Sequence, residues 1–465
     1  MMGRTGFFIF VFLTFAARAP AEFRPASPAV AERYVAEAFA RNLALQARTL
    51  DVEQARARLA EARGAWQPRI DVVARYSEAD GGRTIDVATG DLLNGVYRTL
   101  NDYLRSQGQA ATFPQIANQT IPFLRDREQE TKLRLTQPIY RPEISRGIEA
   151  AREVAGGREA QLAAYRRELR LAVLTAYHGY LQTEAAVEIL DSAAQLTAEA
   201  LRVNRVLFET DKVTEDRVLR AEADDLGVRQ QHAEAERDRN SARAYFNFLL
   251  NRPLATEIER ASEDELRTLA ETLLAGAEPG LLAPNRREEL LALRHAADAA
   301  AANEAAAHAR MRPTLALAVE GGIQGTEYRT GTGAGFTQGS LVAEFNIWDG
   351  RQHRSQIEQA RIDRRQAELQ LQSVREQLAL QLQQAGDEYR AAVAAYRAAA
   401  RRGDAAARVF ELVSQREREG LVNQLNFLDA RNELTRAELN RAITRQRLFI
   451  AAATLDRAAA ITPLP

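Results

Sequence analysis

Small and apolar residues recur at steps of three and four along two stretches without proline, residues 143–252 and 314–462. In the second stretch they are Leu371, Val374, Leu378, Leu382, Ala385, Tyr389, Ala392, Tyr396, Ala399, Gly403, Ala406, Phe410 and Val413. A mean step of about 3.5 residues is that of a heptad seam, which packs against a partner helix in a left-handed supercoil. A second, more polar seam runs from Ala176 to Phe208. The pattern predicts very long antiparallel helices and an elongated molecule.

Four short segments alternate apolar and polar residues, which is the period of a β-strand. They are residues 70–77, 132–139, 314–320 and 340–347. An apolar face opposite a polar face fits the lipid-facing wall of a membrane barrel. Two soluble hairpins packed on the helices are the alternative. The apolar run at residues 341–348 and the export signal described below favour the membrane interpretation.

The two connections between paired strands differ in length. The shorter one contains glycine-rich sequence, residues 321–335, in which no GKS or GKT motif occurs, so a phosphate loop is disfavoured. We expect a flexible outer hairpin loop there. The longer one, residues 79–127, exceeds an ordinary connection, and we expect an ordered or functional outer loop.

The chain contains two copies of one unit, which reads helix, strand, strand, very long helix, turn, helix. Three segments of the first copy recur in the second: residues 65–70 at 310–315, 137–142 at 345–350 and 218–221 at 427–430. The first copy comprises a helix (22–64), strands (65–140) and a long helical hairpin (141–251). A linker without a counterpart (252–285) precedes the second copy, which comprises a helix (286–310), strands (311–349) and a long helical hairpin with the C-terminus (350–465).

The composition excludes several functional classes. The 465 residues include no cysteine, so cysteine-ligated metal sites and cysteine nucleophiles are excluded. The formal net charge of −1 gives no overall positive field for nucleic acid. The five histidines form no i,i+4 pair, and no catalytic motif occurs. We therefore expect no catalytic residue, no cofactor and no metal site.

The N-terminus has the layout of a secretory signal peptide. Arg4 precedes an apolar run at residues 6–17, and small residues at Ala19 and Ala21 predict cleavage after residue 21. An N-terminal membrane anchor is the alternative, but a spanning helix needs ~20 apolar residues. No cysteine follows the run, which excludes a lipoprotein anchor. We expect an exported protein.

The signal peptide, the duplicated unit, the Trp348-Asp349-Gly350 sequence at the predicted strand exit and the tip at residues 420–430 together resemble the TolC-like outer-membrane efflux protein family. The resemblance covers almost the whole mature chain. It implies a mainly α fold with a small β part, in which very long antiparallel coiled-coil helices and four membrane strands per chain complete an α-barrel and a β-barrel as a homotrimer. Part of residues 252–285 would form a belt. Four strands cannot close a barrel alone, so membrane strands require oligomerisation.

The resemblance also implies partners and a location. A periplasmic adaptor would link the trimer to a proton-driven or ATP-driven inner-membrane exporter, in tripartite efflux or type I secretion. The strands would lie in the lipid of a Gram-negative outer membrane and the helices in the periplasm, with no nucleic-acid partner. The alternatives are a periplasmic coiled-coil scaffold or adaptor without a membrane barrel, and an exported enzyme. The cargo stays open between drugs, metals, peptides and proteins.

The turns of the two long hairpins, at residues 208–214 and 417–423, are the candidate docking sites. In the family the tip glycine and its neighbours meet the adaptor; Gly420 matches that glycine, and Asp211 replaces it in the first copy. Aspartate tolerates a left-handed turn. The resemblance marks as adaptor contacts Asp211, Lys212, Val213, Thr214, Gly420, Leu421 and Val422, with Val213, Leu421 and Val422 as the exposed apolar contacts. Ordinary helix-hairpin turns are the alternative.

A periplasmic gate is expected beside the tips. In many family members acidic residues line a constricted entrance there; Asp429 matches one such position, and Asn426 occupies the other. Arg217 stands where the family often has aspartate, with Asp216 beside it. Three copies of Asp429 around an axis would concentrate negative charge and favour cations. An ordinary solvated helix residue is the alternative for Asp429.

Overall fold

The computed structural model describes residues 27–275, 287–331, 333–419 and 421–464. The chain divides into two compact units. We call Met1–Ala57, Ala151–Ala300 and Ile362–Pro465 the helical unit, and Arg58–Ala150 and Ala301–Arg361 the sheet unit. The predicted signal peptide, residues 276–285 of the predicted linker, and Gly420 lie outside the described residues.

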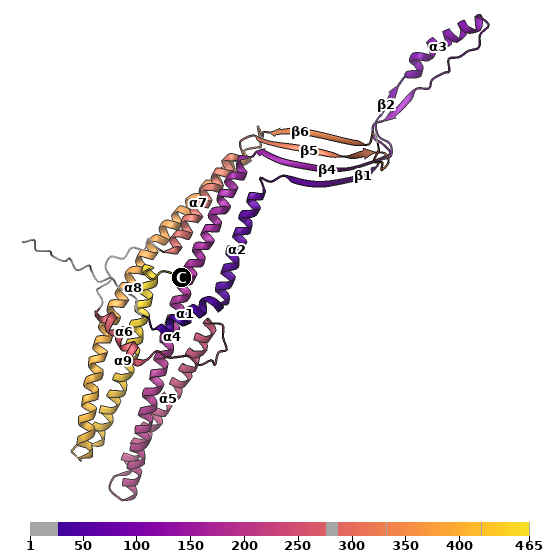
Figure 1. Ribbon diagram of the computed structural model, residues 1–465. Helices are drawn as coiled ribbons and strands as arrows, with labels where there is room; N and C mark the ends of the chain where they lie inside the picture. Colours follow the sequence, from indigo (N-terminus) through magenta and orange to yellow (C-terminus); the bar gives the residue numbers. More distant parts are fainter. Residues whose placement is uncertain (1–26, 276–286, 332, 420, 465) are drawn as a thin grey trace, which may run out of the picture. The chain divides into compact units, whose positions relative to one another are not determined.

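Two very long helices dominate the fold (Figure 1). Helix α4, Pro142–Glu209, has 68 residues and α8, Gln352–Arg418, has 67, so each is ~100 Å long at ~1.5 Å per residue. A shorter helix follows each one, α5 (Glu215–Leu249) after α4 and α9 (Gln424–Ala459) after α8. Apart from α3, described below, the other helices of the described chain are α1 (Ala29–Arg41), α2 (Leu43–Gly64), α6 (Glu263–Ala275) and α7 (Glu288–Ala309). The predicted fold class, mainly α with a small β part, is confirmed.

The segment predicted as one helix at residues 22–64 is interrupted at Asn42. The side chain of Asn42 accepts a hydrogen bond from the N–H of Leu45 (3.0 Å) and donates one to the carbonyl of Leu249 (2.9 Å). A side-chain acceptor at this position satisfies a free N–H at the start of a helix. Asn42 therefore ends α1, begins α2 and ties the junction to the end of α5.

The heptad seam of α8 faces the interior of the helical unit. Leu378, Leu382, Ala385, Tyr389, Ala399, Gly403 and Ala406 are buried, and the other seam positions are half-buried. The seam of α4 is also covered, except at Phe208, which is exposed beside the turn. Periodicity thus predicts which faces of both helices are packed.

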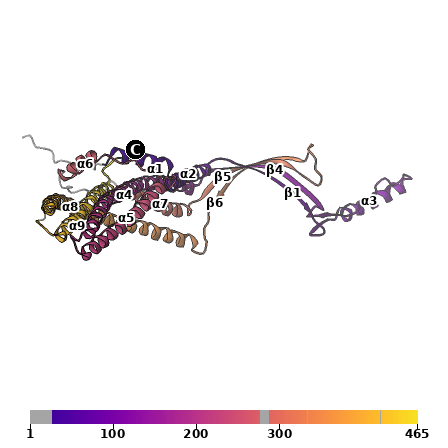
Figure 2. The ribbon, with the colours of Figure 1, turned by 90° about the horizontal axis from the view of Figure 1, so that it is seen from below.

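Helices α4, α5, α8 and α9 pack together in the helical unit, as the view from below shows (Figure 2). Polar side chains join them: His178 to Gln446 between α4 and α9 (2.8 Å), Thr197 to Asp225 between α4 and α5 (2.9 Å), and Arg402 to Glu433 between α8 and α9 (2.7 Å). An aromatic cluster of Tyr34, Tyr177, Phe246, His178 and Phe449 lies in the core. The unit therefore has a conventional buried core within one chain.

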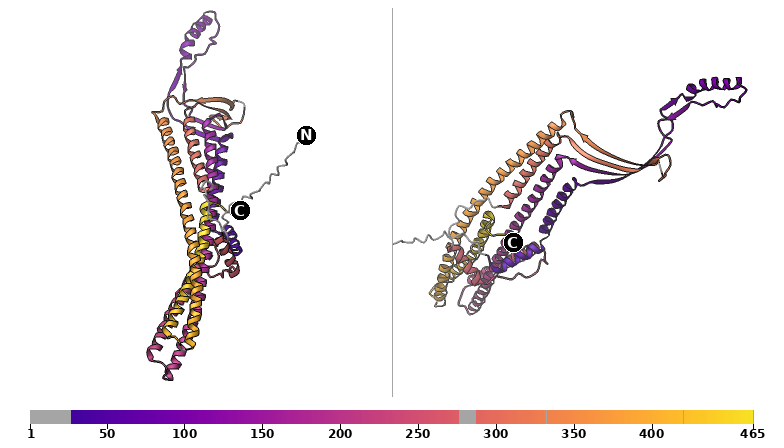
Figure 3. Two further views of the ribbon diagram at one scale, coloured as in Figure 1. Left: turned by 90° about the vertical axis from the view of Figure 1, so that its left-hand side faces the viewer. Right: turned by 45° about the horizontal axis from the view of Figure 1, so that its top comes forward.

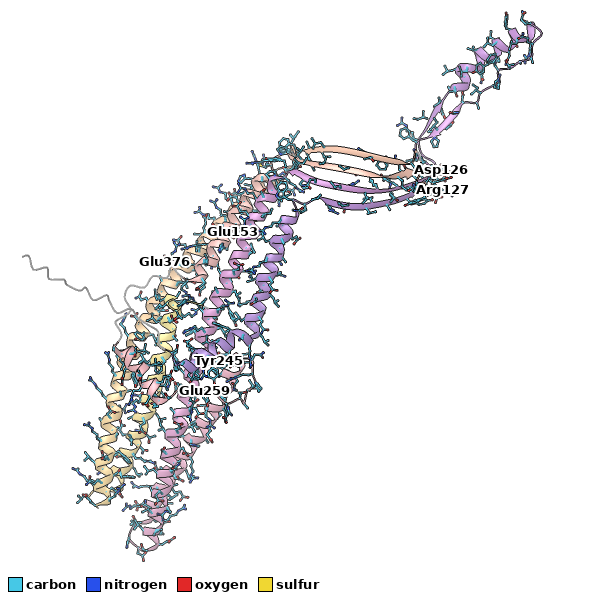
Figure 4. All side chains as sticks on the ribbon, in the orientation of Figure 1. Asp126, Arg127, Glu153, Tyr245, Glu259 and Glu376 are labelled. Carbon is cyan, nitrogen blue, oxygen red and sulfur yellow. The ribbon has the colours of Figure 1, made fainter. Side chains whose placement is uncertain are left out.

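The described part of the linker, with α6, is attached to this core by tyrosine hydroxyl groups. The hydroxyl of Tyr177 accepts from the N–H of Ala261 (2.8 Å) and donates to the carbonyl of Glu259 (3.3 Å), while the hydroxyl of Tyr389 donates to Leu273 (2.9 Å). Burial raises the pKa of Tyr177 to about 12, so its hydroxyl stays protonated. Glu259 is labelled in Figure 4. These bonds fix the linker to the helices it crosses.

The sheet unit contains a four-stranded antiparallel sheet in the order β1-β4-β5-β6 (Figure 1). Its strands are β1 (Arg69–Glu78), β4 (Arg127–Tyr140), β5 (Thr314–Gly325) and β6 (Gly335–Glu344). All four predicted strands exist, but several of their ends differ: β4 begins at Arg127 and β6 at Gly335, each five residues before the predicted start. Gly321 and Gly322, expected in the outer loop, lie in β5, and β6 ends before Phe345, so the Trp348-Asp349-Gly350 sequence follows the strand instead of ending it. A Cβ atom at Gly322 would lie 2.2 Å from the carbonyl oxygen of Thr131, so glycine permits the close approach of β4 and β5.

The long outer connection between β1 and β4 is ordered. It contains helix α3 (Thr89–Ser106) and a small hairpin of β2 (Thr84–Val87) and β3 (Gln119–Pro122). Asp126 and Arg127, labelled in Figure 4, mark the point at which the connection enters β4. We call residues 79–126 the outer excursion.

Candidate functional site

The turn between α4 and α5 closes α4 with two backbone hydrogen bonds. The N–H of Asp211 donates to the carbonyl of Phe208 (3.0 Å), and the N–H of Lys212 donates to that of Leu207 (2.9 Å). These two bonds form a Schellman motif, in which the residue after the helix takes a left-handed conformation. Asp211 has a φ of 56°. Aspartate therefore adopts the conformation that glycine adopts most easily.

The turn between α8 and α9 repeats this pattern. The N–H of Leu421 donates to the carbonyl of Arg416 (2.8 Å), the same spacing as from Lys212 to Leu207. Asn423 caps α9 by accepting from the N–H of Asn426 (3.0 Å), and Thr214 occupies the corresponding N-cap of α5. Both turns lie at one end of the helical unit (Figure 3). The two tips thus share one local design, as the sequence repeat indicates.

The apolar surface of the tips differs from the expectation. Leu421 is exposed, as expected, but Val213 and Val422 are half-buried. Each valine directly precedes an N-cap, and an apolar residue there packs against the fourth residue of the helix; those residues, Val218 and Phe427, are half-buried as well. Besides the expected Leu421, two further apolar residues are exposed here: Phe208 in the first tip and Leu425, two residues past the second.

The predicted gate residues lie just beyond the turns. Asn426 and Asp429 are exposed on α9, and within the described chain the carboxylate of Asp429 makes no ion pair. Asp216 is exposed, accepts from the hydroxyl of Thr214 and lies 3.7 Å from Arg220; Arg217 is half-buried. Of the two predicted gate acids, Asp216 thus lies near Arg220, whereas Asp429 forms no ion pair with a described residue.

Sequence reasoning missed a buried ion pair near the tips. Arg431 on α9 is 3% exposed and binds the carboxylate of Asp224 on α5. The pair joins the α4–α5 hairpin to the α8–α9 hairpin, whereas Arg402–Glu433 joins helices within one hairpin. A buried charge whose partner is removed is strongly destabilising. The two residues lie 207 positions apart, so no local motif in the sequence predicts that they pair. The one hint is that Arg431 lies two residues after Asp429, a predicted gate residue.

The two faces of the sheet differ in polarity. Ile70, Val72 and Tyr76 of β1 share one face with Leu133 of β4 and Leu341 of β6, and all five are exposed. This face continues through Leu135, Val319 and Leu317 in register. The sheet therefore presents a continuous apolar surface that no described residue covers.

The opposite face carries a row of ion pairs across three strands. Lys132 lies 2.8 Å from Glu130 and 2.9 Å from Glu320, Arg134 also binds Glu320, and Arg75 lies 3.7 Å from Glu130. Alternation of lipid-facing and polar positions along each strand is the pattern of membrane strands. The geometry of the sheet thus matches the sequence pattern.

Strands β1 and β6 are the edges of this sheet. Each strand has 10 residues, and its N–H and C=O groups that point away from the sheet have no strand partner within the described chain. An exposed edge pairs readily with another strand. The sheet is therefore open on both sides in a single chain.

No helix among the described residues is long and apolar enough to cross a membrane. The same residues contain no cluster of acidic or histidine side chains suited to hold a metal ion.

In sequence, one part of the chain matches a known protein family. Residues 282–460 match the outer membrane efflux protein family. No curated protein matches the chain in sequence.

The fold is that of solved outer-membrane channels. The CmeC channel of Campylobacter jejuni is similar with a TM-score of 0.74 and 14% identity, over 93% of this chain and 86% of that one. The open state of the MtrE channel of Neisseria gonorrhoeae gives 0.73 and 18%, over 92% and 88%. The outer membrane protein VceC of Vibrio cholerae gives 0.72 and 16%, over 93% and 96%.

These comparisons confirm the expected resemblance to the TolC-like outer-membrane efflux protein family. The family match covers the second copy and its C-terminal helix, and the structural likeness covers nearly the whole chain. The matched family and structures are channel proteins, not enzymes.

Proposed function

We propose that this chain, which has the fold of outer-membrane channels and matches the efflux family over residues 282–460, is one protomer of a homotrimeric outer-membrane duct. The duct gives passive exit to substrates that an inner-membrane exporter delivers through a periplasmic adaptor, in tripartite efflux or type I secretion. The protein lies in the outer membrane of a Gram-negative bacterium, with its helices in the periplasm, after removal of residues 1–21.

The sheet carries this proposal. Its strands have 10, 14, 12 and 10 residues, enough for tilted strands to cross a bilayer, which takes about 9–11 residues. The exposed apolar face suits lipid, and the row of ion pairs suits a water-filled interior. The two open edges require other strands, because unpaired backbone groups are not tolerated in lipid. Copies of the same chain can supply them, β1 of one against β6 of the next.

A second exposed apolar surface supports assembly of the helices. Tyr245 and Phe248 on α5 are exposed, and Tyr245 borders an apolar pocket with Leu171, Ala172 and Gly179 of α4. Tyr245 is labelled in Figure 4. Large exposed aromatic residues beside an apolar pocket are typical of interfaces. We assign this surface to the neighbouring protomer, which would close the α-barrel.

The tips are the proposed docking site for the adaptor. The adaptor-contact residues are Asp211, Lys212, Val213, Thr214, Gly420, Leu421 and Val422. The shared backbone pattern of the tips gives a trimer six similar sites, and the exposed Phe208, Leu421 and Leu425 supply apolar contact area.

The gate is proposed at Asp429, Asn426, Asp216 and Arg217. Three exposed copies of Asp429 around an axis would attract cations. The substitution Asp429→Ala is expected to raise cation conductance or alter selectivity in planar bilayers. Unchanged conductance and selectivity would remove Asp429 from the gate.

Trimers in purified outer membranes test the function directly. A closed barrel survives detergent at low temperature, so unheated protein should migrate in gel electrophoresis as a compact trimer that becomes monomer on boiling. Recovery of the protein as a soluble periplasmic monomer would instead favour a coiled-coil scaffold or adaptor and would contradict the duct.

A further inference from the structure

Helix α3 of the outer excursion has one face that is occupied within the chain. Asn94 donates to the carbonyl of Ile116 (2.7 Å) and accepts from its N–H (2.8 Å). Asn101, two turns later, forms the same pair of bonds with Phe113 (2.7 and 3.1 Å). Two asparagines thus clamp the backbone of the returning segment along the helix.

Other contacts fix the same face. The ring of Tyr97 lies 5.3 Å from that of Phe113 between the two clamps. A Cβ atom at Gly90 would lie 2.3 Å from the carbonyl oxygen of Ile116, so glycine permits the segment to approach the helix. Asn118 donates to the carboxylate of Asp91 (2.9 Å) at the start of the helix. These contacts hold α3 and its return segment as one ordered element.

The opposite face of α3 is apolar and uncovered. Leu92, Leu93, Val96, Leu100 and Tyr103 are 40–75% exposed, and no described residue covers them. The positions Leu93, Val96, Leu100 and Tyr103 follow steps of three, four and three. These are the a and d positions of a heptad seam, which suits packing against another helix. We call these five residues the α3 seam.

The charges around the seam disfavour a membrane surface as its partner. A helix that lies on an anionic membrane carries lysine and arginine on its polar face. The polar residues of α3 include two acids, Asp91 and Asp102, and two arginines, Arg98 and Arg105, and Asp102 and Arg105 pair with each other (3.1 Å). The helix therefore has no net positive charge with which to bind anionic lipid.

The size of the seam indicates a tethered partner. Five side chains over three helical turns bury less than the ~800 Å² per partner of a stable interface formed from solution. A second copy that is already held nearby loses little further entropy when it binds, because its effective concentration is high. In a barrel built from identical chains, every β1–β4 connection leaves from the same rim. Three copies of the excursion would thus start at one end of the barrel.

We propose that α3 packs through its seam against α3 of the other copies, forming a helical bundle beyond the outer rim of the duct. This proposal rests on the homotrimer proposed above. The bundle covers the exposed leucines and adds contacts between protomers at the end of the sheet away from α2 and α4.

Cysteine cross-linking of the full-length protein tests the bundle, because the natural chain contains no cysteine. Val96→Cys places a thiol in the seam, and the matched control Arg98→Cys places one two residues away at an exposed position off the seam. After mild oxidation of outer membranes, we expect severalfold more disulfide-linked dimer from Val96→Cys than from Arg98→Cys on non-reducing gels.

The same samples, run unheated, distinguish the two proposals. Trimers without a preferential Val96→Cys cross-link would overturn the bundle and leave the duct intact. Absence of trimers in both variants and in the unmodified protein would overturn the duct itself. If Val96→Cys forms no cross-link and is also protected from a water-soluble maleimide that labels Arg98→Cys, the seam lies in lipid and the bundle is wrong.

Discussion

The helical unit and the sheet unit place their large apolar side chains in opposite ways. In the helical unit Phe246 and Leu448 are 0% exposed. In the sheet unit Val72 is 72% exposed and Leu341 65% exposed. Burial of apolar surface is the main stabilising contribution to folding in water, so the helical unit can be stable as one chain. The exposed face of the sheet lacks this stabilisation within the described chain.

Shielded ion pairs occur in both units. Lys132 of the sheet is only 12% exposed and lies between two glutamates. The helical unit has buried pairs, such as Arg431–Asp224, and solvated pairs, such as Arg402–Glu433; solvated pairs contribute only ~0–1 kcal/mol. The helical unit packs its apolar side chains inward, whereas the sheet has one exposed apolar face and one face with ion pairs, which would suit lipid and water in the proposed duct.

The largest expected effect is in the core of the helical unit. Phe246→Ala removes a fully buried ring next to Tyr34 and Tyr177, and should lower the free energy of unfolding by about 3–5 kcal/mol. Chemical denaturation in detergent, followed by circular dichroism, measures this change. The matched control is Phe248→Ala on the same helix, because Phe248 is 68% exposed; it should leave protomer stability nearly unchanged. Equal losses would contradict the comparison.

The next effect separates the two faces of the sheet. Leu341→Arg places a charge on the apolar face of β6, and Ser340→Arg places the same charge on the polar face. An arginine that faces lipid costs about 2–4 kcal/mol at the middle of the bilayer, so Leu341→Arg should sharply reduce trimers in the outer membrane. Quantitative immunoblots of unheated membranes measure the yield. If the two variants assemble equally, the apolar face does not meet lipid.

A third effect is a pH dependence confined to the helical unit. Burial lowers the pKa of His178 from its ordinary 6.5 to about 4, and nearby Arg445 adds to the lowering. Below pH 6.5 the unfolded chain binds a proton that the folded chain does not. The free energy of unfolding should therefore fall as the pH drops from 6.5 to about 4, by up to ~1.4 kcal/mol per pH unit.

Denaturation at several pH values, with His178→Gln beside the natural protein, isolates this contribution. The variant keeps the titration of the carboxylates but lacks that of His178, so its stability should fall less over the same interval. Parallel profiles for the two proteins would show that His178 titrates normally.

The last effect concerns the tips and is measured as conductance instead of stability. Asp224→Asn leaves Arg431 buried without its carboxylate partner, and should loosen the contact between the two hairpins near the gate. Planar-bilayer recordings should then show a higher conductance. Glu433→Gln, which breaks a solvated pair within one hairpin, is the matched control and should conduct as the natural protein does. Equal conductance of all three would exclude the Arg431–Asp224 pair from gating.

Sequence periodicity predicts the packed faces of α4 and α8 and the position of all four main strands, because long regular elements repeat their burial pattern many times. It fails at strand ends: β4 and β6 begin five residues before their predicted starts, and at the end of β5 Gly321 and Gly322 carry no side chain to alternate. It also leaves α3 unassigned, although the spacing from Leu93 to Tyr103 is helical, because that short seam lies within a long connection.

The sequence predicts the parts of the candidate site that depend on neighbouring residues, but not the contact between distant ones. The left-handed turn at Asp211 follows from local chemistry and is present. The half-buried Val213 and Val422 follow from their position before an N-cap, which the expectation of exposed contacts overlooked. The Arg431–Asp224 pair joins residues distant in sequence, so only the packing of two hairpins reveals it.

Electron cryo-microscopy of the purified protein in lipid nanodiscs would show whether three copies of the chain form the proposed duct. We expect a threefold assembly in which four strands from each of three chains close one barrel, with β1 of each copy paired to β6 of the next and Val72 and Leu341 facing lipid. A single chain whose sheet is covered by its own helices, with both edges unpaired, would contradict it.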